Sequence, residues 1–301
     1  MTTPGSSYQP STGGMETFNI AHGFVESLVR GMRNSFLSDS DYHHLTQCDN
    51  LEDCKMNLGE TDFGPGLADE SVLTPTVLQS AAISKLSTEF LYLRSQSVAP
   101  LSTFLDFITH EYMIDNIMLL LKGTMSGRDI NDLISMAHPL GLFKESTMRS
   151  IPTFESNAKG YADLYQCVLV DTPVGVYFSK FLQETSQNLG SAGEVRNVLE
   201  ELGAVVTQFS QYAPAWSVHT SGASKSIDDA FYERDVHQLE LAFEGQMHFA
   251  CFYAYVKLKE QEIRNLVWIS ECVLQNQKES INDFVPIFSQ HAPWRVKNQR
   301  R

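Results

Sequence analysis

The chain has 301 residues, of which 43% are hydrophobic and 19% are charged, a composition typical of a globular protein with one elongated or two compact domains. Its formal net charge of -14 argues against a nucleic-acid partner, because phosphate binding requires clustered Lys and Arg, and favours basic protein surfaces instead. No apolar run approaches the length of a membrane span, so we predict no transmembrane helix.

The first part of the chain reads as a leader followed by three helices. Residues 1–14 have neither the basic start nor the apolar core of a signal peptide, and we predict a disordered leader there. Apolar residues at helical spacing predict a helix over 18–37. The stretch 38–41 resembles a helix cap before a short helix through Leu45, and a third helix is expected over 51–58.

Gly and Pro residues mark the boundaries of the next predicted elements. Residues 62–66 predict a turn, and Thr74 before Pro75 predicts the start of a helix that continues to Arg94. A further helix is expected over 101–122, and Gly123 would end it as a left-handed C-cap. Arg128 to Ala137 predicts another short helix.

The middle and the end of the chain differ in character. We expect helices over 158–170, over 171–182 and over 194–209, and then one that begins near Ile227 and continues to Ile281. The organisation is weakest at 183–226, where Pro, Gly, Ser and Ala are frequent, and 289–301 is predicted to be a solvated basic tail. No segment alternates like a strand. The sequence therefore predicts an all-α helical domain over 15–288.

The most strongly patterned segment runs from His248 to Leu274. Its apolar residues recur every three or four positions, the period of a helix with one buried stripe. The stripe comprises Phe252, Tyr253, Val256, Ile263, Leu266, Val267, Val273 and Leu274. Because a long helix gains most of its stability from tertiary contacts, other helices must pack along it.

The spacing of a Glu and an Asn in this segment is repeated in an earlier predicted helix. Glu260 and Asn265 have the same spacing as Glu111 and Asn116, and each Glu falls in line with the apolar stripe of its own helix. A carboxylate that faces a core must be paired, hydrogen-bonded or open to a cavity. Two interpretations remain open: pairing inside a helix bundle or emergence at its rim, and a cavity-facing or partner-facing role.

Of the three neighbouring residues Trp268, Glu271 and Cys272, the first and the last each have two interpretations. Trp268 lies off the stripe, so it either anchors an interface or widens the buried face of the bundle. Glu271 lies beside it. Cys272 has no basic neighbours, which favours a small core residue over a reactive thiol.

Motifs for chemistry are missing from the sequence. It contains no phosphate-binding loop, no GxSxG elbow and no HExxH motif, so we predict no catalytic residue, no cofactor site and no metal site. The five Cys are odd in number and form no CxxC pair, which fits a reducing compartment.

Several long strings resemble one protein family. GFVESLVRGMRNSFLSDSDYHHL, LSTFLDFITHEYMIDNIMLLLKGT and FYAYVKLKEQEIRNLVWISECV, with HPLG, LVDTP and INDFVPIF, are similar to the subunit d family of vacuolar-type proton ATPases, which has a counterpart in archaeal-type rotary ATPases. The resemblance covers 15–182 and 227–288. It implies a funnel-shaped all-α protein made of related helical modules.

The resemblance also implies a function. A member of this family would be a non-catalytic subunit on the cytosolic face of vacuolar, lysosomal or endosomal membranes, without a transmembrane helix of its own. Its partners would be the proteolipid c-ring, the central-stalk subunits and other subunits of the membrane sector. It would pass torque from the stalk to the ring and so drive proton transport and organelle acidification. In that setting the candidate cavity or interface residues are Glu111, Glu260, Trp268, Glu271 and Cys272.

The chain departs from the family pattern in its middle. Between LVDTP and FYERDV, the region 183–225 is shorter than in family members, which implies an incomplete middle module. An alternative function follows from this departure. The chain could be a divergent or truncated helical scaffold that keeps the fold without assembling into an active pump.

Overall fold

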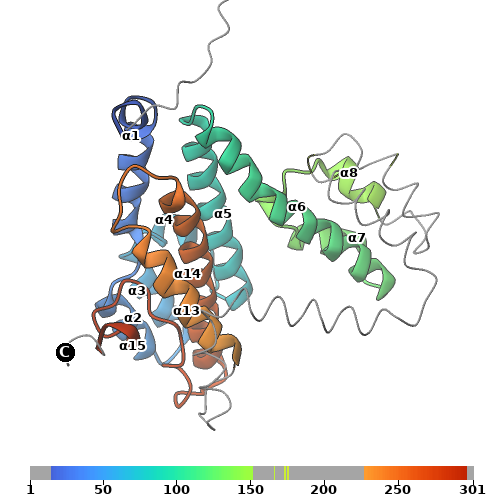
Figure 1. Ribbon diagram of the computed structural model, residues 1–301. Helices are drawn as coiled ribbons and strands as arrows, with labels where there is room; N and C mark the ends of the chain where they lie inside the picture. The colour runs from blue at the N-terminus through green and yellow to red at the C-terminus, as the bar shows by residue number, and fades with distance from the viewer. Residues whose placement is uncertain (1–14, 152–165, 167–172, 174, 176–226, 297–301) are drawn as a thin grey trace, which may run out of the picture. The chain divides into compact units, whose positions relative to one another are not determined.

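The structure is a computed structural model that describes residues 15–151 and 227–296, together with residues 166, 173 and 175 (Figure 1). The described residues form helices and no strand, which confirms the predicted all-α class. Apart from residues 166, 173 and 175, the helices expected between 158 and 209 lie outside this described part.

Contacts divide the chain into two units, whereas the sequence suggested a single helical domain. Unit 1 comprises residues 1–105 and 236–301, and unit 2 comprises residues 106–235. The helices of unit 1 are α1 (Met15–Met32), η1 (Arg33–Ser35), α2 (Asp39–Thr46), α3 (Leu51–Gly59), α4 (Gly64–Leu67), α5 (Pro75–Ser95), α14 (Ala250–Leu274) and α15 (Pro293–Val296). Unit 2 holds α7 (Ile130–Met136), η2 (Pro139–Gly141) and α8 (Glu145–Ser150), and the unit boundaries fall within α6 (Leu101–Met125) and α13 (Ile227–Leu241).

Side-chain caps fix where the early helices begin. Ser38 accepts a hydrogen bond from the backbone N–H of Asp41 and forms a capping box at the start of α2. Thr74 accepts from the N–H of Val77, and Pro75 follows it as the first residue of α5. Both helix starts agree with the expectation from the sequence.

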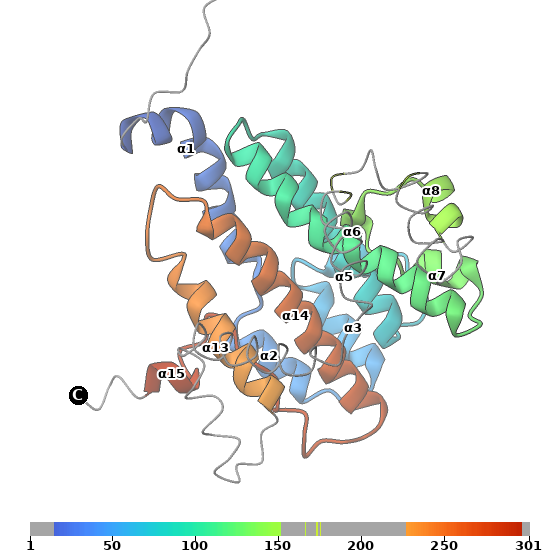
Figure 2. The same ribbon diagram turned by 45° about the vertical axis from the view of Figure 1, so that its right-hand side comes forward.

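Helix α14 is the centre of unit 1. It packs against α5 along much of its length, as the two views in Figures 1 and 2 show, and also contacts α1, α2 and α3. Phe252, Tyr255 and Leu258 are fully buried although they point in different directions around the helix. The expected single stripe is therefore too narrow, and two of its members, Tyr253 and Leu274, are exposed.

A break separates α13 from α14, so the predicted continuous helix from 227 to 281 is wrong. Met247 has a positive φ of 61°, which a helix cannot contain. The break is held from α1: Arg30 Nη1 donates to the backbone oxygen of Phe243 at 2.9 Å, and the Met247 N–H donates to Glu26 Oε1 at 2.9 Å. Side chains from a distant segment thus replace the backbone hydrogen bonds that the helix loses.

Two local predictions from glycine are also wrong. Gly123 lies inside α6, which continues to Met125. A Cβ atom at Gly123 would stand 2.3 Å from Leu133, so this position is small because α7 packs directly against it. The expected turn at 62–66 includes the start of the short helix α4.

The start of the predicted basic tail is packed rather than solvated. Ala292 is fully buried, and Trp294 Nε1 donates to Glu240 Oε2 at 3.1 Å. Arg295 Nη2 binds the same oxygen at 3.2 Å. The carboxylate of Glu240 on α13 therefore ties residues up to 296 to unit 1.

The same asparagine clamp is found among the described residues of both units. In unit 1, Asn265 Nδ2 donates to the backbone oxygen of Val285 at 2.7 Å, and the N–H of Val285 donates to Asn265 Oδ1 at 3.3 Å. In unit 2, Asn116 makes the same two bonds with His138, at 2.9 and 2.7 Å. Both Val285 and His138 directly precede a proline. The spacing that is repeated in the sequence therefore corresponds to the same pair of hydrogen bonds in both units.

The helices that carry the two clamps also match in length. α6 and α14 each have 25 residues, and the clamp Asn is the sixteenth residue of each. Gly141, the last residue of HPLG, is small because a Cβ there would stand 1.9 Å from Asn116 Nδ2. The clamp thus explains why HPLG ends in a glycine.

We predict that Asn265→Ala lowers the free energy of unfolding by about 1–3 kcal/mol, because the buried N–H and C=O of Val285 lose both partners. Asn116→Ala should have a cost of the same order in unit 2. The control is Gln275→Ala, an exposed position expected to change stability by less than about 0.5 kcal/mol. Urea denaturation followed by circular dichroism measures all three, and equal values for Asn265→Ala and the control would refute the clamp.

Candidate interaction surface

A buried ion pair lies in the middle of α14. Lys259 Nζ and Glu262 Oε2 are 2.8 Å apart, and both side chains are almost inaccessible to solvent. Lys259 also donates to the backbone oxygen of Ser35 at 3.0 Å, and Glu262 Oε1 accepts from the N–H of Leu37 at 2.6 Å. The ring of Phe36 lies 4.3 Å from Lys259 Nζ, within the range of a cation–π contact. The pair therefore fastens α14 to the segment between α1 and α2.

Burial dominates the electrostatics of this region. It raises the pKa of Glu262, and the opposing effects of Lys259 and the Leu37 N–H do not cancel the rise. Burial also raises the pKa of Tyr255, whose hydroxyl donates to Glu89 Oε2 at 2.6 Å. Glu89 is in turn paired with Lys85 at 2.6 Å. The hydrogen bond from Tyr255 to Glu89 thus holds α14 to α5.

The opposite side of α14 faces outward. Its members are Tyr253, Lys257, Glu260, Arg264, Trp268, Glu271 and Leu274, which follow one another at intervals of three or four residues. We call these residues the outward face of α14. They are exposed or half-buried, whereas the residues between them are mostly buried. A helix with this distribution presents a continuous mixed polar and apolar strip to its surroundings.

Three of the predicted interface residues lie on the outward face of α14. Glu260 is half-buried and pairs with Lys257 at 3.1 Å. Trp268 is 41% exposed, and its indole N–H donates to the backbone oxygen of Ser280 at 3.0 Å. Glu271 is half-buried and accepts from Gln275 Nε2 at 3.1 Å. The structure thus brings Glu260, Trp268 and Glu271 together on one side of one helix.

The other two predicted residues lie elsewhere. Glu111 is exposed on α6 in unit 2. Cys272 is buried on the inner side of α14, where burial raises the pKa of its thiol, which favours the small core residue over the reactive thiol. Neither residue shares the outward face of α14.

The buried ion pair was not predicted from the sequence. Glu262 rather than Glu260 is the carboxylate that faces the core, two residues further along. The available signal was Lys259 three residues before it, a spacing that lets opposite charges meet on one helix. A helix that is buried on most sides conceals this signal, because its buried residues do not form a single narrow stripe.

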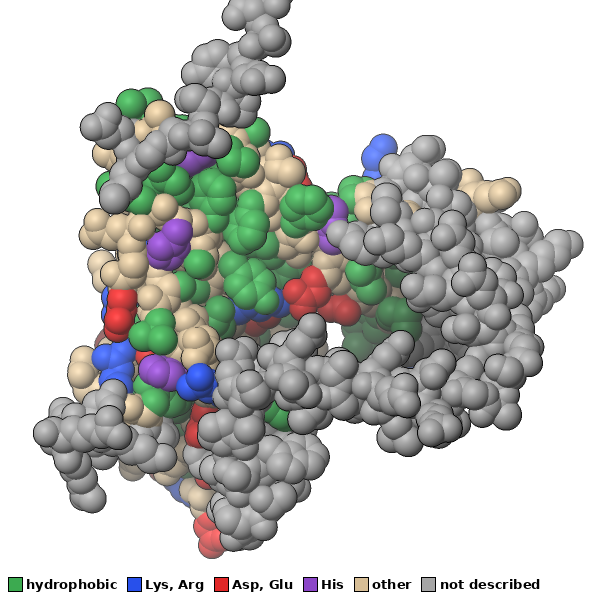
Figure 3. All heavy atoms as spheres, in the orientation of Figure 1, with side chains coloured by type: hydrophobic (Ala, Val, Ile, Leu, Met, Phe, Trp, Pro, Cys, Tyr) green, Lys and Arg blue, Asp and Glu red, His purple; other side chains and the backbone are tan. Residues whose placement is uncertain are grey.

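The outward face of α14 begins beside an apolar area. Figure 3 shows hydrophobic side chains gathered where α1 and the start of α14 lie. The exposed apolar residues of these helices include Ile20 and Phe24, one turn apart on α1, and Tyr253 on α14. Clusters of this kind are typical of surfaces that bind other proteins.

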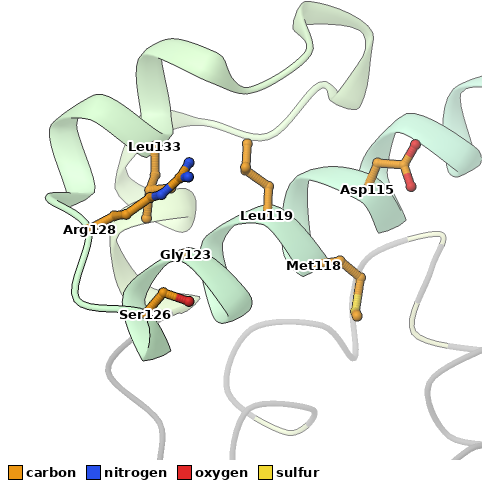
Figure 4. Close-up of a pocket in the computed structure, with 7 residues that line it drawn as sticks. All are labelled: Asp115, Met118, Leu119, Gly123, Ser126, Arg128 and Leu133. Atoms are coloured by element: carbon orange, nitrogen blue, oxygen red, sulfur yellow. The ribbon is translucent and has the colours of Figure 1, made fainter.

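Unit 2 has a pocket of its own between α6 and α7 (Figure 4). It is lined by Asp115, Met118, Leu119, Gly123, Ser126, Arg128 and Leu133. Arg128 and Asp115 give it one positive and one negative group, and the rest is largely apolar. No group of His, Cys, Asp and Glu suited to a metal ion occurs among the described residues. Along the same residues, no helix has the length and apolar character that crossing a membrane requires.

Over the residues that the structure describes, the chain is a helical protein with two clamped helices, a buried ion pair in α14 and a mixed polar and apolar outward face on that helix. The family model "ATP synthase (C/AC39) subunit" matches residues 25–200 and 191–284 of the chain. The chain therefore belongs to the ATP synthase (C/AC39) subunit family.

Curated relatives cover nearly the whole chain. It is 34% identical over 354 residues to V-type proton ATPase subunit d of Dictyostelium discoideum, with 92% of this chain and 98% of the relative covered. It is 34% identical over 348 residues to V-type proton ATPase subunit d2 of Arabidopsis thaliana, covering 89% and 97%. With the Saccharomyces cerevisiae subunit d it is 32% identical over 347 residues, covering 90% and 99%. These alignments are longer than the chain, so the relatives contain residues without a counterpart in it.

We predict that removing one partner of the buried pair, in Lys259→Met or Glu262→Leu, costs about 3–5 kcal/mol of unfolding free energy, since a charge is left buried alone. The double variant should lose clearly less than the sum of the two single variants. Thermal and urea unfolding of the four proteins measure this coupling. Additive losses would show that Lys259 and Glu262 act independently.

Proposed function

We propose that this chain is a non-catalytic subunit of a rotary vacuolar-type proton-transporting ATPase. In this proposal it couples the central stalk to the proteolipid ring on the cytosolic face of vacuolar, lysosomal or endosomal membranes. Its role in ATP-driven proton transport and organelle acidification would be mechanical. The observation that carries the proposal is the similarity to V-type proton ATPase subunits d along almost the full length of both proteins.

The arrangement of charges supports a mechanical role. The buried polar groups of α14 are used to hold helices together: Lys259 and Glu262 bind each other and the backbone between α1 and α2. Asn265 fastens the segment around Val285. Such internal ties make unit 1 stiff, and stiffness is what a part that transmits torque requires. The net charge of -14 suits basic surfaces on its partners.

The outward face of α14 is the proposed contact surface for partners within the pump. The exposed Trp268 is a residue type enriched at protein interfaces, and Glu260 and Glu271 on the same face would suit basic groups on a partner. Glu111 on α6 is proposed as a contact of unit 2. Cys272 is buried, so we propose a supporting role for it beneath the outward face of α14.

Two observations favour a second function. The alignment with the Dictyostelium relative spans 354 positions against the 301 residues of this chain, and the family model matches in two segments that overlap at 191–200. Both facts suit a middle region that has been shortened. The alternative is therefore a helical scaffold that keeps the fold but does not assemble into an active pump.

Complementation distinguishes the two functions. The chain is expressed in cells that lack their own subunit d, and organelle acidification is measured together with co-purification of the proteolipid ring. The proposed function predicts recovery of both. Recovery of neither, with the protein present and folded, would favour the scaffold.

In complementing cells, we expect Glu260→Lys to reduce assembly and acidification, because it reverses a charge on the outward face of α14 and places a second cation beside Lys257. Because this half-buried pair still reaches solvent, its loss should cost folding only about 1 kcal/mol. Glu279→Lys, an exposed charge reversal beyond the end of α14, is the matched control. Full assembly and acidification with Glu260→Lys would remove this residue from the proposed surface.

A further inference from the structure

The matching helices α6 and α14 can be compared residue by residue. When the clamp residues Asn116 and Asn265 are aligned, both helices begin and end together. Phe107 then corresponds to Val256, and Ile114 corresponds to Ile263. These positions lie seven residues apart in each helix, so they belong to one face.

This face is covered in unit 1. Val256 is 0% exposed and Ile263 is 7% exposed. Lys259 lies between them on the same face, and it contacts Ser35, Phe36 and Phe63 from the N-terminal part of the chain. The cover in unit 1 is therefore supplied by segments around η1 and α4.

The corresponding face is open in unit 2. Phe107 is 57% exposed and Ile114 is 40% exposed. Met118, one turn further on, is also 40% exposed and contributes to the pocket of unit 2. Three large apolar side chains thus line one side of α6, from Phe107 to the pocket that Figure 4 shows. We call Phe107, Ile114 and Met118 the open face of α6.

We propose that the open face of α6 is a docking surface for a basic amphipathic helix of another polypeptide. The clamp comparison indicates a packed segment as occupant, because the equivalent face of α14 is covered by the segments around η1 and α4 in unit 1. Charge indicates a basic partner, since the carboxylates of Glu111 and Asp115 lie exposed beside the open face. The helix would place apolar residues on Phe107 and Ile114 and a Lys or Arg beside the acids. This inference depends on the proposed function only in that the partner is expected within the pump.

Photo-crosslinking in cells tests the proposal on the full chain. A photoreactive amino acid replaces Ile114, and the same group replaces Met56, an exposed residue of α3, as the control. We expect position 114 to crosslink to a helical segment of another polypeptide that carries an apolar stripe and Lys or Arg. Met56 should not give this product. Crosslinks from position 114 to this same chain, to lipid or to no polypeptide would overturn the proposal.

Substitutions then test the chemistry of the contact. The pair Phe107→Ser and Ile114→Ser should lower affinity for the crosslinked partner by about tenfold or more, the loss typical of truncated interface anchors. Met56→Ser with Val72→Ser removes similarly exposed side chains in unit 1 and should leave the affinity unchanged. Unchanged thermal unfolding in both pairs excludes loss of folding as the cause. Equal affinity of the two pairs would overturn the proposal.

Charge exchange gives an independent measurement. Glu111→Lys with Asp115→Lys should weaken the contact, and the opposite change in the partner's basic residue should restore it. A contact that is indifferent to both changes would contradict a basic partner. Failure of the wild-type chain to restore acidification would refute the proposed function. A retained crosslink from position 114 to a basic helix would in that case still support the docking surface.

Discussion

The asparagine clamp is the interaction on which the arrangement of both units depends. Each clamp joins a 25-residue helix to an extended residue before a proline, 20 or 22 positions further along the chain. Proline cannot follow a helical residue without strain, so the residue before it is extended and its N–H and C=O have no helical partners. A carboxamide supplies one donor and one acceptor and satisfies both groups at once. The neighbouring elements then pack onto a helix whose connection is already fixed.

The two clamped helices differ in which side chains they leave accessible. In unit 1, α14 is enclosed by α1, α2, α3 and α5, so it can present only its outward face. In unit 2, the equivalent helix keeps Phe107, Ile114 and Met118 accessible. The same clamp thus occurs in one unit whose long helix is enclosed and in another whose long helix has an exposed apolar face beside carboxylates. The chain belongs to the ATP synthase (C/AC39) subunit family. A subunit of a multi-subunit assembly needs both a rigid interior and surfaces for contact, and this difference between the units is of that kind.

Much of this organisation could be predicted from the sequence. Helical periodicity located α1, α3, α5 and α14, and the Thr-Pro pair gave the start of α5. The repeated Glu and Asn spacing correctly related α6 to α14, although the Asn rather than the Glu proved to be the shared contact.

The misses have physical causes. Local sequence could not show the break between α13 and α14, because Glu26 and Arg30 stabilise it from more than 200 residues away. Periodicity favoured Glu260 as the core carboxylate because it assumes one buried stripe, whereas α14 is buried on most sides and its core acid is Glu262. Gly123 has the position expected of a cap, and the sequence does not reveal that Leu133 packs against it.

Electron cryo-microscopy of the pump purified from complementing cells tests the proposed coupling role most directly. The proposed function predicts density for this chain between the central stalk and the proteolipid ring, with a helix of another subunit lying over Phe107 and Ile114. An assembled complex that lacks the chain, or one in which the chain is present but makes no contact with either stalk or ring, would contradict it.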